Sequence, residues 1–536
     1  MTAYAYPLLI KHLLVTPIAH ASRCEIVYRD RMRYGYPTLK QRIGRLGSAL
    51  TSLGVEPGDT VAVMDWDSHR YLEAFFAIPM LGAVLQTVNV RLSPEQVTYT
   101  LNHARADVIL CNVEFLPLLQ GIRPHLTTAK RFICLSDDAA IQGDFPWDGE
   151  YEALLASGDP GHDFPDFDEN TRATTFYTTG TTGLPKGVYF SHRQLVLHTL
   201  SLLANLALAA PSQALRRDDV YMPITPMFHV HAWGFPYAAV LAGMKQVYPG
   251  RYTPETLMRL YREEKVTFSH CVPTIMQMML GCPEARGVDF TGWKVIIGGS
   301  ALPKALAQAA LARGIEIFAG YGMSETGPLL SLSLLKPELL DGGETELSTR
   351  ILAGLPGPLV DLRVVDAAMR DVPRDGSTAG EVVARAPWLT QGYLHDPDAS
   401  AALWEGGYLH TGDIGFLDAE GYLHITDRIK DVIKTGGEWV SSLELEDILH
   451  QHPAVAEVAV IGVKDAKWGE RPLALIVRRP GQDVDVATLQ AHVMGFAERG
   501  IVSKYAVPER ILFVETLDKT SVGKLDKKAM RAKFAD

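Results

Sequence analysis

Residues 177–188 read Tyr-Thr-Thr-Gly-Thr-Thr-Gly-Leu-Pro-Lys-Gly-Val, a run of hydroxyl, glycine and lysine groups that suits a polyphosphate. Glycine lets the backbone approach a ligand closely, while hydroxyls and Lys186 donate to phosphate oxygens. The run is not the common P-loop, because Gly180 and Gly183 are too close together and Lys186 precedes Gly187. The alternative is a flexible linker. It is disfavoured because a linker seldom holds one lysine behind a proline between a strand and an apolar helix.

Five further segments carry polar groups that could serve a nucleotide. Residues 298–303 follow a predicted strand, at the edge where open α/β sheets bind ligands. Residues 320–326 hold a tyrosine that can stack on a base and a carboxylate that can hold Mg²⁺. Asp413 could bind ribose hydroxyls, residues 434–439 form a second glycine loop, and residues 519–524 end in a lysine. Each segment alone has an ordinary explanation as a turn or solvated surface, so the prediction depends on their occurrence together.

Alternating helices and strands must position these segments. Leucines and an isoleucine recur at helical spacing over residues 36–54, which predicts a helix, and a second helix is predicted over 71–81. The predicted strands cover residues 61–64, 84–88, 108–111, 132–135, 172–177, 266–270, 294–297 and 316–319. This alternation predicts an α/β fold with parallel-rich sheets covered by helices. A helix is also predicted after Ser191, which places the glycine-rich loop between a strand and a helix.

After about residue 350 the pattern changes to dense glycine turns and short strands, which predicts a β-rich subdomain. The residues after Arg428 predict a small α+β unit, and the charged join at residues 427–431 suits a hinge. We therefore predict an N-terminal domain over residues 1–427, a hinge over 428–430 and a mobile C-terminal domain over 431–536.

Composition argues against several classes of protein. The net charge of −11 disfavours general nucleic-acid binding, which needs a basic face. Five scattered cysteines without a Cys-x-x-Cys pair predict reduced thiols in the cytoplasm, with neither a zinc ribbon nor a disulfide framework. The N-terminus lacks the basic region of a signal peptide. The longest apolar run, over residues 195–210, is interrupted by polar residues and predicts a buried helix, so we expect no integral membrane segment.

Taken in order, these segments resemble the adenylate-forming superfamily, which contains acyl-CoA synthetases, peptide-synthetase adenylation domains and beetle luciferases. The resemblance covers roughly residues 36–531. Residues 226–233, Pro-Met-Phe-His-Val-His-Ala-Trp, and residues 437–442, Gly-Glu-Trp-Val-Ser-Ser, look like one branch of that superfamily. The branch holds the bacterial medium- and long-chain fatty acyl-CoA synthetases and the ligases for 3-methylthiopropionate.

The resemblance implies a first half-reaction in which a carboxylate attacks the α-phosphate of ATP, giving acyl-AMP and pyrophosphate. Lys524 would reach in from the C-terminal domain to both the carboxylate and the α-phosphate, and with His229 and Glu325 it forms the predicted catalytic set. Thr181 and Glu325 would hold Mg²⁺. The implied ATP site comprises Thr178, Thr179, Gly180, Thr181, Thr182, Gly183, Lys186, Gly299, Ser300, Ala301, Tyr321, Gly322, Ser324, Asp413 and Arg428.

The resemblance also implies a second half-reaction, in which CoA takes the acyl group after the C-terminal domain rotates about Lys430. The glycine loop of residues 434–439 then replaces Lys524 at the site. The implied CoA tunnel comprises Lys434, Gly436, Gly437, Glu438 and Trp439.

The implied acyl pocket is mostly apolar or small, which favours a monocarboxylate with an apolar tail. An amino-acid substrate would need a buried acid to pair with its ammonium group. Trp233 either opens onto a tunnel for a fatty acid or forms a fixed wall that favours short acids or 3-methylthiopropionate. The implied pocket residues are His229, Trp233, Val272, Pro273, Gly298, Gly322 and Met323.

Some positions depart from the superfamily pattern. Thr179 and Ser324 replace a more usual serine and threonine and keep a hydroxyl, whereas Asp518 stands where a proline usually precedes the last motif. Two other functions stay open: an adenylating enzyme that loads a carrier protein, which ranks lower because no carrier domain is found, and a non-catalytic acyl-nucleotide sensor, which would require lost catalytic residues. The superfamily resemblance further implies a homodimer formed through the N-terminal domain.

Overall fold

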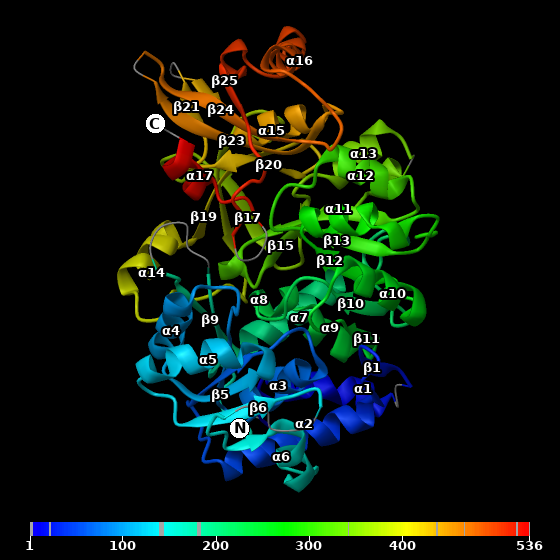
Figure 1. Cartoon of the computed structure of the whole chain (residues 1–536), viewed down its shortest axis with the longest axis vertical. Coiled ribbons are helices and arrows are strands. Elements are labelled where there is room, and N and C mark those ends of the chain that lie inside the picture. The colour runs from blue at the N-terminus through cyan, green and yellow to red at the C-terminus, as the bar shows by residue number, and fades with distance from the viewer. Residues whose placement is uncertain are drawn as a thin grey trace.

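The computed structural model describes residues 4–20, 23–138, 144–178, 184–340, 342–435, 438–465, 467–520 and 524–534. Figure 1 shows two helix-covered sheets in the lower and middle parts of the molecule, with the C-terminal unit at the top. The first 3-10 and α-helical turns, Ile10–Leu14 and α1 (Val15–Ala19), pack against the helices of the lower part.

The first sheet has seven strands, and all except the last are parallel. Its central strands are buried at all or nearly all positions and are rich in valine, isoleucine and leucine, as expected for a parallel sheet covered on both faces. The order is β7 (Gly149–Glu150), β6 (Arg131–Leu135), β5 (Ala106–Asn112), β3 (Thr60–Met64), β4 (Val84–Thr87), β8 (Arg172–Tyr177) and β9 (Gly187–Ser191).

The second sheet has nine strands. The parallel ones are β1, β10, β11, β12, β13 and β14. The order is β16 (Leu355–Pro356), β15 (Leu329–Leu332), β14 (Glu316–Gly322), β13 (Lys294–Ile297), β12 (Phe268–Cys271), β10 (Val220–Pro223), β11 (Lys245–Tyr248), β1 (Glu25–Tyr28) and β2 (Met32–Gly35). The carboxyl ends of β13 and β14 carry the predicted nucleotide segments.

Helices between the strands cover these sheets. They are α2 (Tyr36–Ser52), α3 (His69–Met80), α4 (Pro94–His103), α5 (Leu116–Ile122), α6 (Tyr151–Ser157), α7 (His192–Ala207), α8 (Val230–Trp233), α9 (Phe235–Ala242), α10 (Pro254–Glu264), α11 (Pro273–Gly281), α12 (Lys304–Leu311) and α13 (Glu344–Arg350). None of the helices in the described part of the chain is long and apolar enough to cross a membrane.

Helix α2 forms as its sequence spacing predicts. Leu39, Ile43, Leu46 and Leu50 lie on one face and are at most 1% exposed. They join α3 and the strands of the first sheet in one hydrophobic cluster. Because each fully buried leucine contributes roughly 2 kcal/mol of transfer free energy, this face fixes α2 against the sheet.

The strand-to-helix prediction for the glycine-rich loop is wrong. The strand β9 follows the loop and pairs antiparallel with β8, so the loop joins two strands of a hairpin before α7 begins. Val188, Tyr189 and Phe190 are β-branched or aromatic and favour a strand. Helix α7 starts where predicted, because Ser191 caps it by accepting from Gln194 N over 3.3 Å.

The β-rich unit predicted after residue 350 is a four-stranded antiparallel sheet of β17 (Asp361–Val365), β18 (Gly380–Arg385), β19 (Leu409–Leu417) and β20 (Leu423–Arg428), with α14 (Pro397–Leu403) inserted before β19. The last part of the chain forms a separate sheet of β22 (Glu438–Val440), β21 (Ile433–Thr435), β24 (Gly469–Arg478) and β23 (Val455–Asp465), with β25 (Arg510–Phe513) beside β24. Helices α15 (Ser442–His450), α16 (Val486–Glu498) and α17 (Lys527–Phe534) accompany it.

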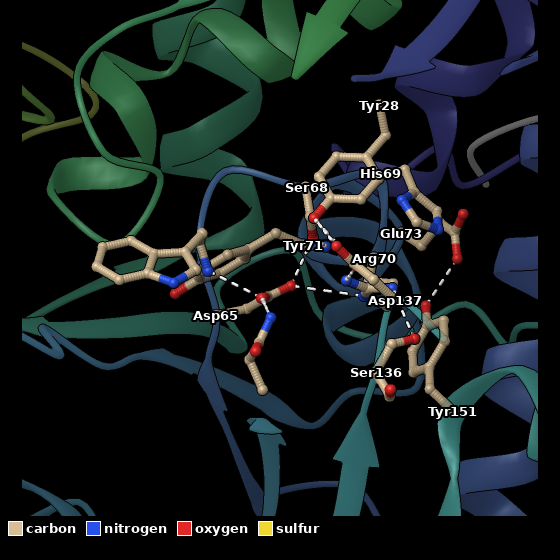
Figure 2. Close-up of polar contacts among 12 residues, drawn as sticks. Tyr28, Asp65, Ser68, His69, Arg70, Tyr71, Glu73, Ser136, Asp137 and Tyr151 are labelled. Carbon is tan, nitrogen blue, oxygen red and sulfur yellow. Dashed lines mark hydrogen bonds and ion pairs between the residues drawn. The ribbon is translucent and has the colours of Figure 1, made fainter. Parts of the chain in front are cut away.

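A buried ionic network fixes the start of α3. Figure 2 shows Asp65, Arg70 and Asp137 joined there, and Arg70 Nη2 donates to Asp137 Oδ1 over 2.6 Å. On the next turn Glu73, which is fully buried, accepts from the Tyr151 hydroxyl over 2.7 Å and from Arg42 Nε over 2.7 Å. The network therefore joins α2, α3 and α6 through paired charges.

Candidate active site

A carboxylate at the edge of the β17–β20 sheet organises one corner of the site. Asp413 on β19 lies directly opposite Arg428 on β20, and the two form an ion pair in which Arg428 Nε lies 3.0 Å from Asp413 Oδ1. The Tyr321 hydroxyl, from β14 of the second sheet, donates to Asp413 Oδ2 over 2.7 Å. Asp413 is 4% exposed, whereas the Arg428 side chain is 47% exposed and reaches solvent. Two sheets thus meet at one buried acid.

The protonation states of this corner follow from burial and charge. Burial and the adjacent Asp413 raise the pKa of Tyr321, so its hydroxyl stays a donor. Burial alone would lower the pKa of Arg428, but the surrounding negative groups, with Asp413 the strongest, together outweigh burial and raise the pKa. The corner therefore presents the Asp413 carboxyl group between a hydroxyl donor and a guanidinium.

A second acid lies directly after β14. Glu325, in the 3-10 turn Ser324–Thr326, is 7% exposed and accepts from the Tyr393 hydroxyl at Oε1 over 2.7 Å. Lys186 Nζ lies 4.5 Å from the centre of the Tyr393 ring, a cation–π contact. The structure thus brings together two of the predicted residues, Glu325 and Lys186. The linking Tyr393 was missed, since a tyrosine after a glycine has no distinctive spacing.

Lys524 reaches this region from the last part of the chain. The residues flanking 521–523 pair with one another, because Thr520 N donates to Lys524 O over 2.7 Å and Lys519 forms a β-bridge with Leu525. A β-carbon added to Gly299 would lie 3.0 Å from Lys524 Cε. Lys524 is therefore in contact with the segment that follows β13.

The electrostatic surroundings of Lys524 shift its titration. Burial, followed by the charge of Arg428, lowers the pKa of Lys524 to about 8, while Asp413 and Glu325 act in the opposite direction. A lysine with such a pKa gains a proton readily when an anion approaches it.

His229 and Trp233 are positioned by an unusual turn. The four residues of α8, Val230 to Trp233, all have positive φ between 46° and 59°, and Gly234 follows at 77°. A left-handed turn of L-residues costs roughly 1–2 kcal/mol per residue, and such strain concentrates at functional sites. His229 directly precedes the turn. Burial, followed by the charge of Lys524, lowers the pKa of His229 to about 3, so its imidazole is neutral.

Trp233, a predicted residue of the acyl pocket, is buried against the end of β13. It is 4% exposed, its ring lies 4.9 Å from that of His270, and its Cη2 would lie 3.0 Å from a β-carbon on Gly298. Val272 and Pro273 are buried at the start of α11, and Met323 is half-buried beside Glu325. The structure therefore brings Trp233 to Gly298 and Val272 to Gly299, directly after β13.

Several predicted residues lie outside the described residues. They are Thr179, Gly180, Thr181, Thr182 and Gly183 of the phosphate loop and Gly436 and Gly437 of the CoA tunnel. Thr178 closes the base of the phosphate loop, because its N–H donates to Lys186 O over 3.0 Å.

Lys434 is not brought to Lys524. It lies on β21, where its N–H donates to Glu470 Oε2 over 3.0 Å, and Figure 1 places β21 high in the C-terminal unit, away from β15. Glu438 and Trp439 belong to β22 of the same hairpin. Lys430, the predicted hinge, is exposed between β20 and β21.

Two family models match the chain: "AMP-binding enzyme" over residues 18–394 and "AMP-binding enzyme C-terminal domain" over residues 444–524. The fold and the site thus define an adenylate-forming architecture, and the chain belongs to the AMP-binding enzyme family.

Individual relatives agree with this assignment. The chain is 42% identical over 508 residues to the "Long-chain-fatty-acid--CoA ligase" of Thermus thermophilus, covering 94% of this chain and 90% of that one. It is 39% identical over 504 residues to the "3-methylmercaptopropionyl-CoA ligase" of Ruegeria pomeroyi, covering 92% and 90%. The fold also matches the crystal structure of the anthranilate CoA ligase AuaEII with anthranoyl-AMP, with a TM-score of 0.86, 24% identity and 99% of each chain covered.

Proposed function

We propose that this protein is an AMP-forming acid–CoA ligase that activates an apolar monocarboxylate, a fatty acid, as acyl-AMP and then forms acyl-CoA. The names of the Thermus and Ruegeria relatives, both CoA ligases, support the reaction class. The observation that carries the proposal is the contact of Lys524 with Gly299, which puts a lysine of low pKa beside Asp413 and Glu325.

In the first step Lys524 neutralises charge as the carboxylate attacks the α-phosphate of ATP. Two approaching oxyanions raise the pKa of Lys524 from about 8, so the lysine is protonated when it is needed. Asp413 accepts from the ribose hydroxyls, and Tyr321 and the Gly299–Ala301 backbone flank the adenine. The neutral His229 lies at the acyl side and adds no charge there. Thr178 and Lys186 belong to the strand ends that hold the phosphates.

Mg²⁺ fits this site by the chemistry of its donors. Glu325 offers a buried carboxylate, the hard oxygen ligand that Mg²⁺ prefers, with Thr181 as the proposed partner. Among the residues the structure describes, no group of three or more His, Cys, Asp or Glu side chains could hold a metal ion. This agrees with an ion carried largely by the nucleotide phosphates, where bound Mg²⁺ would neutralise their charge.

The second step requires the C-terminal unit to turn, because Lys434 on β21 lies away from the site while Lys524 is in it. We place the pivot at Lys430, the exposed residue between the two sheets. Rotation would bring Lys434, Gly436, Gly437, Glu438 and Trp439 to the site as a passage for the CoA thiol.

One observation favours a second candidate, a ligase for short acids or 3-methylthiopropionate. Trp233 packs on His270 and against Gly298, and this packing supports an indole that acts as a fixed wall of the pocket. The carrier-protein alternative predicts activity with a phosphopantetheinylated carrier and little with free CoA.

The deciding experiment is CoA- and ATP-dependent AMP release measured with straight-chain acids from acetate to palmitate and with 3-methylthiopropionate. A maximum at medium or long acids means that Trp233 swings aside, and Trp233→Ala should then leave the preference unchanged. A maximum at butyrate or the thioether means that Trp233 is a fixed wall, and Trp233→Ala should shift the preference to longer acids. Absence of AMP release with every acid contradicts the proposed reaction.

The setting of the enzyme is part of the same proposal. The five cysteines are free thiols in the structure, in keeping with a reducing compartment such as the cytoplasm. We also expect a homodimer, which light scattering of the purified chain tests directly.

A further inference from the structure

Tyr393 lies between two groups of the proposed ATP site and contacts both. Its hydroxyl donates to Glu325 Oε1 over 2.7 Å, and Lys186 Nζ lies 4.5 Å from its ring centre. We propose that Tyr393 is a positioning residue, which orients the Glu325 carboxylate toward Mg²⁺ and holds Lys186 beside it. This inference rests on the proposed function, in which those two residues serve the metal and the phosphates.

The backbone around Tyr393 is tied to the same two places as its side chain. Thr390 N donates to Glu325 O over 3.0 Å, which binds the segment to the turn after β14. Leu394 N donates to Gly187 O over 2.8 Å, which binds it to the first residue of β9. The segment of residues 390–394 therefore joins the backbone of Glu325 to β9, the strand that follows the phosphate loop.

The far side of the segment is anchored as well. Tyr393 N donates to Ser400 Oγ over 2.8 Å, and Ser400 lies in α14. Asp396 caps α14 by accepting from Ala399 N over 3.0 Å, and Trp404 Nε1 donates to Thr390 O over 3.0 Å. Because helix and strand hold it from both sides, the Tyr393 ring has little freedom to leave Glu325.

The hydroxyl chemistry suits this role. The Tyr393 hydroxyl donates to Glu325 Oε1 and leaves the second carboxylate oxygen available to a metal ion. A bond to one carboxylate oxygen fixes the direction of the other, and the hydrogen-bond partners of a metal-binding carboxylate commonly change metal affinity about 10- to 100-fold. The ring supplies a separate contact, since its face attracts the Lys186 ammonium.

The first test is Tyr393→Phe, which removes the hydroxyl and keeps the ring. We expect the Mg²⁺ concentration for half-maximal acyl-AMP formation to rise about 10-fold. The conversion of supplied acyl-AMP to acyl-CoA should not change, because acyl-AMP no longer carries the β- and γ-phosphates. Tyr393→Leu should be more impaired in ATP affinity, since it also removes the ring beneath Lys186.

Tyr408→Phe is a matched control. The Tyr408 hydroxyl donates to Asp361 Oδ2 over 2.7 Å, and Arg363 and Arg385 lie 4.9 and 5.2 Å from its ring centre. The substitution removes the same kind of bond, from a tyrosine hydroxyl to a carboxylate beside a cation, at a more exposed position. If Tyr393→Phe and Tyr408→Phe show equal Mg²⁺ dependence, the positioning role is wrong.

A double-mutant cycle separates positioning from general support of the fold. If Tyr393 acts through Glu325, then Tyr393→Phe should add almost nothing to Glu325→Gln. Independent, multiplying losses would contradict the proposal.

Calorimetry of ATP binding gives a readout that needs no acyl substrate. ATP binding to the native enzyme should strengthen when Mg²⁺ is added, and Tyr393→Phe should lose most of that gain while keeping metal-free ATP binding. If no acid is adenylated by the native enzyme, the proposed function fails, whereas this binding comparison still decides the role of Tyr393.

Discussion

Lys524 and Gly299 lie far apart in the chain, yet a β-carbon on Gly299 would sit 3.0 Å from Lys524 Cε and 3.3 Å from Val272 Cγ1. Gly299 has φ of +80°, a conformation that other L-residues adopt only with strain. The backbone of residue 299 thus leaves just enough room for the lysine.

Gly299→Ala should slow acyl-AMP formation about 10- to 100-fold, because displacing a reacting group by a fraction of an ångström has effects of that order. The second half-reaction from supplied acyl-AMP should be affected far less. The control is Gly287→Ala, since Gly287 has a similar φ of +69° and its added β-carbon would meet no atom within 4 Å. Equal adenylation rates in the two variants would show that the contact with Lys524 is unimportant.

The pH dependence of adenylation should follow Lys524. Its pKa is lowered to about 8, so the active protonated form is present below that pH and is lost as the pH rises through it. We therefore expect kcat/KM for ATP, measured by pyrophosphate release, to fall above pH about 8. Lys524→Arg should be slow but free of this decline, because guanidinium stays protonated. An unchanged alkaline decline in Lys524→Arg would assign it to another group.

Asp413→Asn should weaken ATP binding about 10- to 100-fold, since hydrogen bonds to a charged group contribute roughly 1.5–3 kcal/mol. The native enzyme should bind ATP better than its 2′- and 3′-deoxy analogues, and the variant should lose much of that discrimination. Asp361→Asn is the control, because Asp361 accepts a tyrosine hydroxyl at 2.7 Å outside the site. If the variant discriminates against the deoxy analogues as the native enzyme does, Asp413 does not hold the ribose.

The sequence predicts most elements of the fold because their local signals agree with their burial. The strand β13 occupies residues 294–297 as predicted, and α2 buries the predicted leucines. The hairpin after the phosphate loop was not predicted, because its second strand is a short β-rich run that lies directly between the glycine-rich loop and the helix α7. The left-handed turn before Trp233 was also missed, since no residue in it except the final Gly234 favours positive φ.

The site could be predicted as a set of residues but not as a set of contacts. The sequence spacing of Asp413 and Arg428 does not predict that β19 and β20 place them opposite each other. The Tyr393 segment is held by an antiparallel bridge to β9 and by the bond from Thr390 N to Glu325 O, which are contacts between residues far apart in the chain. Tertiary register of this kind leaves no periodic trace in the sequence.

The final prediction concerns the stability of the N-terminal part. Arg42→Met leaves Glu73, which is 0% exposed, without its cation, and breaking a buried ion pair typically costs about 3–5 kcal/mol. Denaturant midpoints should fall clearly in this variant. Arg259→Met, which breaks the exposed i,i+4 pair with Glu263, should change the free energy of unfolding by at most about 0.5 kcal/mol.

The free energy of unfolding measured at acid pH tests the same ionic network around Arg42. Burial alone would raise the pKa of Glu152, but hydrogen bonds from His69 and Arg42 lower it to about 2. A lowered carboxyl pKa stabilises the fold above the unfolded value of about 4.3, and that contribution is lost as the pH falls toward 2. The native protein should therefore lose stability over this range, and Arg42→Met should lose less. An identical acid slope in both proteins would mean that Glu152 is not held ionised by Arg42.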